Sequence, residues 1–109
     1  QTLANIAERK ADPVLEGKYR KAVASSPQRE IVLRALAKVQ DSHNEVWTTN
    51  AYKIALDDGV DNSSQYVGQL VSEEYGAEIE KLRERYYRFK DSLFHAYVLA
   101  RPKMYQQKS

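Results

Sequence analysis

The stretch from residue 77 to residue 97 constrains the fold most, because it contains neither glycine nor proline. Propensity alone would allow one long helix there. Near its centre, however, lie three aromatic residues of the kind that favours strands: Tyr86, Tyr87 and Phe89. We therefore predict a β-hairpin in which Glu78–Arg83 and Tyr86–Phe89 pair around a charged tip, Arg83-Glu84-Arg85. An unbroken helix through this stretch is the alternative, and it would change the fold.

The clearest helix prediction lies upstream, from Pro27 to about Gln40. Ser26 can accept a hydrogen bond from a free backbone N–H, and proline suits the first turn because it lacks this group. Apolar residues recur at helical spacing behind it: Ile31, Val32, Ala35, Leu36 and Val39. The basic residues of this helix are expected to point outward: Arg29, Arg34 and Lys38.

Weaker apolar patterns predict further helices on both sides. One short helix is expected around Leu3, Ile6 and Ala7, and another is expected over residues 14–23. The last helix should begin at a cap formed by Asp91 and end near Pro102.

Two short helices in the middle of the chain predict a helix-turn-helix. The first follows an extended stretch at residues 45–48, with Thr48 or Thr49 as its N-cap, and ends where Gly59 can adopt a left-handed conformation. The second runs from about residue 63 to 72, and Asn62 and Gln65 have the spacing of a capping box.

Together these elements predict a mainly α-helical fold with a small β-hairpin, a winged helix-turn-helix. We expect a helical lead-in over residues 1–25, the winged domain over residues 26–103 and a frayed tail over residues 104–109. Because the sequence begins with Gln1 rather than methionine, we expect it to be a piece of a longer polypeptide.

Two segments also resemble a known family. They are Ser26–Ala37 (Ser-Pro-Gln-Arg-Glu-Ile-Val-Leu-Arg-Ala-Leu-Ala) and Tyr87–Val98 (Tyr-Arg-Phe-Lys-Asp-Ser-Leu-Phe-His-Ala-Tyr-Val). They resemble the C-terminal winged-helix domain of archaeal-type AAA+ and STAND P-loop ATPases, over roughly residues 12–101. Relatives often have proline after the aspartate, where this chain has Ser92. The resemblance implies an accessory module whose partner is the ATPase core of a parent chain.

No motif predicts catalysis, a cofactor or a metal site. The four glycines are isolated, so no phosphate-binding loop is present in the sequence, and there is no cysteine. His43 and His95 are too few for a histidine-only zinc site. No apolar run approaches the roughly 20 residues that span a bilayer, so we expect no membrane contact and a cytoplasmic location.

Charge is distributed unevenly along the chain although the net charge is only +2. Residues 41–80 contain nine acidic residues and a single basic one, Lys53, whereas eight Lys/Arg residues lie on each side of this segment. The predicted second helix of the helix-turn-helix has no basic residue, and repulsion from phosphates opposes its entry into a DNA groove.

Two functions remain open from the sequence. The first is a non-catalytic module for protein–protein or interdomain regulation, with the acidic helix-turn-helix against a basic surface. The alternative is binding of double-stranded DNA through the basic residues of the predicted hairpin, which is the wing of this fold. The candidate contact residues are Lys81, Arg83, Arg85, Arg88, Lys90, Asn62, Gln65 and Gln69. The hairpin aromatics and Trp47 are interpreted as packing residues.

Overall fold

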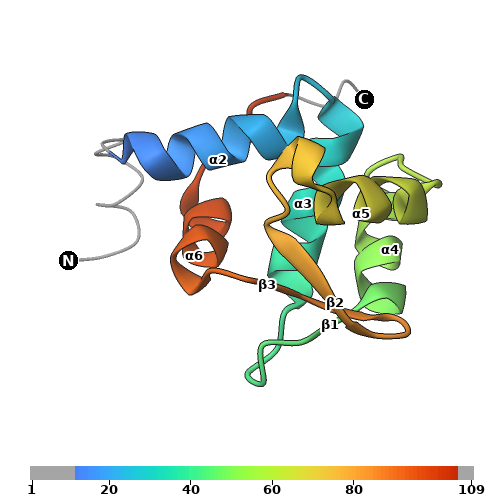
Figure 1. Ribbon diagram of the computed structural model, residues 1–109. Coiled ribbons are helices and arrows are strands. Elements are labelled where there is room, and N and C mark those ends of the chain that lie inside the picture. Colours follow the sequence, from blue (N-terminus) through green and yellow to red (C-terminus); the bar gives the residue numbers. More distant parts are fainter. Residues whose placement is uncertain (1–11, 106–109) are drawn as a thin grey trace.

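The computed structural model of the protein describes residues 12–105, which form helices packed around a small sheet (Figure 1). The helix expected around Leu3, Ile6 and Ala7 lies outside the described residues. The elements are, in chain order, α2 (Pro13–Val23), α3 (Pro27–Val39), β1 (Val46–Trp47), α4 (Thr48–Asp57), α5 (Ser63–Val71), the 3-10 turn η1 (Glu73–Tyr75), β2 (Ile79–Arg83), β3 (Tyr86–Phe89) and α6 (Ser92–Ala100).

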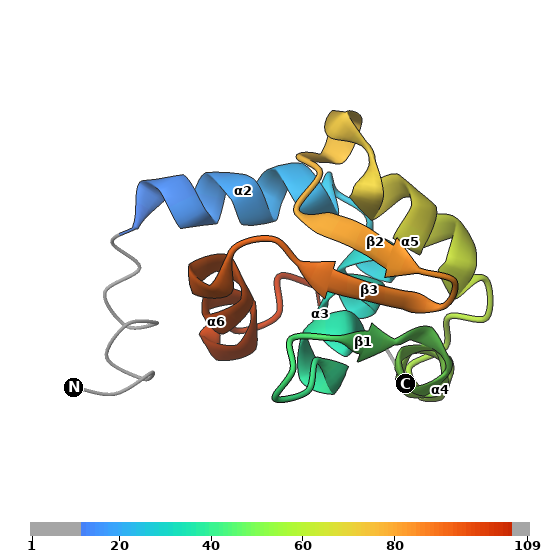
Figure 2. The same ribbon diagram turned by 60° about the horizontal axis from the view of Figure 1, so that its bottom comes forward.

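The predicted hairpin is confirmed, and the long helix is not formed. β2 and β3 are antiparallel, with Ile79 opposite Phe89 and Arg83 opposite Tyr86. The tip turns through Arg85, which has a positive φ of 71°. β1 pairs with the other edge of β3, so the strand order is β1-β3-β2, and Figure 2 shows β3 between its two neighbours.

Three helix starts follow the local rules of the sequence. Ser26 and Asp91 accept hydrogen bonds from Arg29 N–H and Leu93 N–H, as predicted. Asp12 does the same for Leu15 N–H at the start of α2.

The N-cap prediction for α4 is wrong. Trp47 occupies the cap position without a side-chain bond, and α4 begins at Thr48. The backbone N–H and the hydroxyl of Thr48 both donate to the Arg85 carbonyl, at 3.0 and 3.3 Å. Thr48 therefore ties the helix-turn-helix to the wing tip instead of capping its own helix.

The capping box expected at Asn62 and Gln65 is not formed. Asn62 is the N-cap of α5, but its side chain accepts no backbone N–H. The amide of Asn62 instead donates to Gln65 Oε1 at 3.2 Å. Gly59, in the preceding turn, has the predicted left-handed conformation, with φ of 94°.

The apolar core is built around α3, which contacts α2, α4, α5, α6 and β1. Its largest fully buried side chains come from several elements and include Tyr19, Leu33, Leu36, Leu70, Ile79 and Phe94. Figure 1 shows α2 and α6 on one side of α3, with α4 and α5 on the other side. This arrangement of a helix-turn-helix, a three-stranded antiparallel sheet and a closing helix is a winged helix-turn-helix fold.

The expectation that Arg29 points to solvent is wrong, because Arg29 is buried. The last carbonyls of a helix lack intrahelical partners, and the end of α2 lies beside the start of α3. Arg29 Nε donates to the Ala22 and Val23 carbonyls, both at 3.1 Å. Its guanidinium also lies 4.2 Å from the centre of the Tyr75 ring.

Candidate interaction surfaces of the wing and the helix-turn-helix

The five basic residues of the wing are all exposed, whereas alternation along the hairpin predicted this for several of them. Three of them form ion pairs within the fold. Arg83 lies 3.0 Å from Glu45 and Arg88 lies 2.6 Å from Glu80. Lys81 lies 3.4 Å from Glu84. Carboxylates of the same protein therefore neutralise much of the positive charge that the sequence places on the wing.

Arg83 is the most constrained of these residues. Its guanidinium bridges β2 to Glu45, which precedes β1, and stacks 4.0 Å from the centre of the Tyr86 ring. The hydrogen bond that Arg83 donates to Glu45 raises the pKa of Arg83 above its usual value, so the guanidinium stays charged at physiological pH. A phosphate group approaching Arg83 has to compete with this carboxylate.

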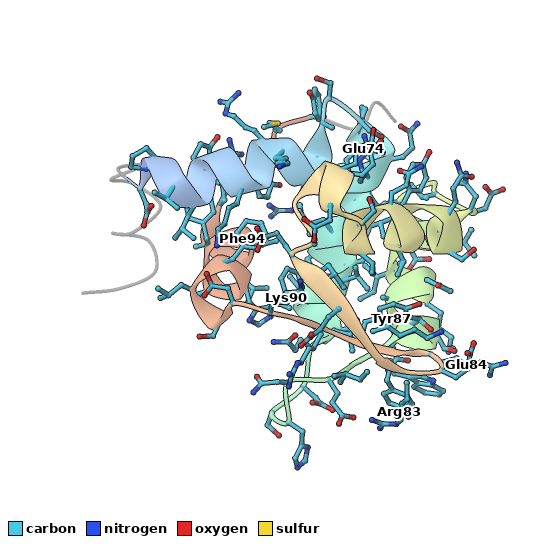
Figure 3. The ribbon with its side chains drawn as sticks, viewed as in Figure 1. Glu74, Arg83, Glu84, Tyr87, Lys90 and Phe94 are labelled. Atoms are coloured by element: carbon cyan, nitrogen blue, oxygen red, sulfur yellow. The ribbon has the colours of Figure 1, made fainter. Side chains whose placement is uncertain are left out.

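Two wing cations remain without an ion pair to any described residue. The Arg85 side chain is exposed at the tip, and the Arg85 carbonyl accepts hydrogen bonds from Thr48. Lys90 donates its backbone N–H to Glu78, and its side chain is also exposed. Figure 3 labels Lys90 close to the middle of the molecule and Arg83 near the wing tip, so the basic residues are spread along the hairpin.

The three polar candidates from the second helix are engaged within the fold. Gln69 Oε1 accepts from Arg29 Nη1 at 2.5 Å. Asn62 and Gln65 bind one another, although both are exposed. Gln69 thus has a structural role that its place on α5 did not indicate.

Acidic residues surround α5, which has no lysine or arginine. Asp57 and Asp61 are exposed on the α4–α5 side, and Glu73 and Glu74 are exposed on η1, after the end of α5. Figure 3 shows Glu74 at the opposite end of the molecule from Arg83 and Glu84. The acidic surface of the helix-turn-helix and the wing tip are therefore separate surfaces.

Trp47 was expected to pack in the core but is 42% exposed. Successive residues of a strand face opposite sides, and Val46 takes the inward position with 1% exposure. Trp47 lies opposite Tyr86 on the outer face of the sheet, where Arg83 stacks on Tyr86. Tryptophan, tyrosine and arginine are the residues most enriched where proteins bind one another. In the sequence, the strand alternation that places Val46 inward was the signal that Trp47 faces outward.

The two histidines are placed apart. His43 lies in an exposed turn. The Asp41 carboxylate accepts hydrogen bonds there from the backbone N–H groups of Glu45 and His43, and these bonds lower the pKa of Asp41. His95 lies on α6, where its Nε2 is 2.8 Å from the Ala37 carbonyl. Within residues 12–105 no group of three or more His, Cys, Asp or Glu side chains is arranged to hold a metal ion.

The fold and these surfaces define the class of the protein as a winged helix-turn-helix domain whose second helix, α5, lies between exposed acidic residues. Comparison with family models, with curated proteins and with solved structures finds no match to this chain. No helix in the described part of the chain is both long and apolar enough to cross a membrane.

Proposed function

We propose that this domain is a non-catalytic protein-interaction module whose acidic helix-turn-helix surface binds a basic surface of another protein or domain. The observation that carries the proposal is the distribution of charge. Helix α5 has no basic residue and lies between exposed acidic residues. Three of the five basic residues of the wing form ion pairs with carboxylates of the same chain. Such a surface repels duplex phosphates and attracts Lys/Arg-rich protein surfaces.

The partner that we propose is the ATPase core of a parent chain, in which the module would act in interdomain regulation. This part of the proposal rests on the resemblance of residues 26–37 and 87–98 to the C-terminal winged-helix domain of AAA+ and STAND ATPases. Those segments form α3 and the passage from the wing to α6.

Binding of double-stranded DNA through the wing is the second candidate. It is favoured by Arg85 and Lys90, whose side chains are exposed and form no ion pair with a described residue. Two such cations supply little affinity, because non-specific DNA binding depends on the number of phosphates that are neutralised.

A DNA titration separates these functions. We expect that a labelled random-sequence duplex, followed by fluorescence anisotropy, binds only weakly at about 50 mM salt and not measurably at about 200 mM. We expect Arg83→Ala with Arg85→Ala to leave this result unchanged. Tight binding that falls steeply with salt and is abolished by the double substitution would overturn the protein-interaction proposal in favour of the wing.

A basic peptide tests the acidic surface directly. Octalysine, added to the isotopically labelled chain, should shift the backbone NMR signals of residues 57–61 and 73–74. Asp61→Lys should weaken its binding about threefold to tenfold. Glu84→Lys makes the same charge change at the wing tip and should have a smaller effect. An octalysine titration that shifts no signal of the helix-turn-helix contradicts the proposal.

A further inference from the structure

A surface pocket lies where the end of α4 meets the start of α5. Its volume is about 160 Å³, and it is lined by Tyr52, Leu56, Val60, Asp61, Ser63 and Ser64. In Figure 1 this junction lies on the side of the molecule away from α6. It belongs to the acidic helix-turn-helix surface and is remote from the interior packing of α2 and α6.

The size and walls of the pocket suit one apolar side chain. Engineered protein cavities of about 150 Å³ are large enough to bind benzene. Tyr52, Leu56 and Val60 provide apolar walls. Leu56 is 58% exposed, so a side chain placed in the pocket would remove apolar surface of Leu56 from water.

Ser63 places a buried polar group beside this pocket. The residue is 4% exposed, and its Oγ has no hydrogen-bond partner among the described residues. A buried hydroxyl without a partner is unfavourable, and native structures rarely contain one. The N-cap of α5, Asn62, also gives no side-chain bond to the first turn. The polar groups at this helix start are therefore poorly satisfied within the fold.

The charges around the pocket select the kind of partner. Asp61 lines it, and Asp57 is exposed at the end of α4. Lys53, one turn earlier on α4, is the only basic residue between positions 41 and 80. The acids outnumber this lysine, so the surroundings favour a cationic segment over an anionic one.

From these contacts we propose that the pocket binds a leucine-sized side chain of a protein segment flanked by lysine or arginine. Tyr52, Leu56 and Val60 contact that apolar side chain, and Asp57 and Asp61 attract the basic residues of the segment. This inference rests on the proposed function, and it names the residues and the peptide chemistry of the contact.

Three heptapeptides test the inference. The first is Lys-Lys-Gly-Leu-Gly-Lys-Lys, and the others replace its leucine with alanine or all its lysines with glutamate. We expect the leucine peptide to shift the NMR signals of Tyr52, Leu56, Val60 and Ser63. We expect it to bind about tenfold more tightly than the alanine peptide, and we expect no binding of the glutamate peptide. Equal affinity of the leucine and alanine peptides overturns the inference.

Two substitutions on α5 form a matched pair. Ser64 is exposed and lines the pocket, so Ser64→Leu should fill it and weaken the leucine peptide about tenfold without unfolding the chain. Gln65→Leu adds the same side chain at the next exposed position, which does not line the pocket, and should leave the affinity unchanged. Unchanged affinity in Ser64→Leu overturns the inference.

Ser63→Ala is a control at a buried position beside the pocket. Because the hydroxyl is buried and has no partner among the described residues, its removal should neither lower the thermal midpoint nor weaken the binding of the leucine peptide. If octalysine still shifts the NMR signals of the acidic surface while Ser64→Leu binds the leucine peptide normally, the pocket inference fails and the proposed function stands. If no basic peptide binds and DNA does, the proposed function itself fails.

Discussion

At the scale of single residues, Glu30 shows how a carboxylate can be buried when both of its oxygens accept hydrogen bonds. It is 1% exposed near the start of α3. Its carboxylate accepts from the Tyr19 hydroxyl at 2.5 Å and from the backbone N–H groups of Met104 and Tyr105 at 2.5 and 3.0 Å. Met104 and Tyr105, which begin the expected frayed tail, are thus held against the core by one side chain.

We expect Glu30→Ala to lower the free energy of unfolding by about 2–4 kcal/mol, because it leaves a buried hydroxyl and two backbone donors without an acceptor. Glu30→Gln keeps the shape and one acceptor oxygen, and it should cost about half as much. Urea unfolding followed by far-ultraviolet circular dichroism measures both. Equal stability of wild type and Glu30→Ala would show that solvent satisfies these donors.

Residues whose role depends on near neighbours were predictable, and those with distant partners were not. The Ser26 and Asp91 caps use backbone groups two or three positions away. Glu30 bonds to residues more than 70 positions later, and nothing in its helical pattern indicates this. Local spacing marked the caps at Ser26 and Asp91 but failed at Thr48 and Asn62, whereas burial of a charge depends on the completed fold.

At the scale of elements, Arg29 joins three helices. From α3 it donates to the end of α2 and to Gln69 on α5, and it stacks on Tyr75 in η1. These contacts set how the helix-turn-helix sits against the first described helix.

A double-mutant cycle measures this connection. Arg29→Met should lower the free energy of unfolding by about 2–3 kcal/mol, because carbonyls at the end of α2 lose their donor. Gln69→Ala alone should cost about 1 kcal/mol. The two should be coupled by at least about 0.5 kcal/mol, whereas Gln65→Ala, on the exposed side of α5, should be nearly neutral. Additive effects of Arg29→Met and Gln69→Ala would contradict a direct bond.

The wing was predictable as an element because aromatic residues at its second strand opposed the helical alternative. β3 matches the predicted Tyr86–Phe89, and β2 starts one residue later than expected. The ion pairs of the wing were not predictable. Arg83 pairs with Glu45, 38 positions earlier, because β1 adds to the far edge of β3. The sequence thus indicated where cations lie along the wing, while their neutralisation depended on sheet order.

At the scale of the whole molecule, Glu16 and Arg101 tie the first described helix to the end of the last one. Arg101 Nη2 lies 2.7 Å from Glu16 Oε2 and its Nε lies 2.8 Å from Oε1, so the pair is bidentate. The hydrogen bond from Arg101 outweighs the opposing effect of burial, and with Tyr97 it lowers the pKa of Glu16 from 4.5 to about 2.

This pair predicts acid sensitivity. Because the folded-state pKa of Glu16 is below its unfolded value, the stabilisation is fully present above pH 4.5 and is lost as the pH falls towards 2. We expect Glu16→Gln to be less stable than wild type by about 2 kcal/mol at neutral pH. That difference should shrink across the acid range in urea unfolding at several pH values. A difference that stays constant with pH would contradict the assignment.

Glu78 acts in the opposite sense and has to be separated from Glu16 in such a titration. Burial raises its pKa despite Lys18 nearby, so its ionisation at higher pH weakens the fold. Comparing each pH curve with that of Glu16→Gln removes this common contribution.

The half-exposed position of Trp47 has a practical consequence for following this protein in solution. It is the only tryptophan of the sequence, and it lies on the outer face of the sheet beside Tyr86. Its emission spectrum therefore reports chiefly on solvent near the wing. A ligand that covers the wing should shift this signal to the blue, whereas one confined to the α4–α5 junction should not, so a single optical probe distinguishes the two faces.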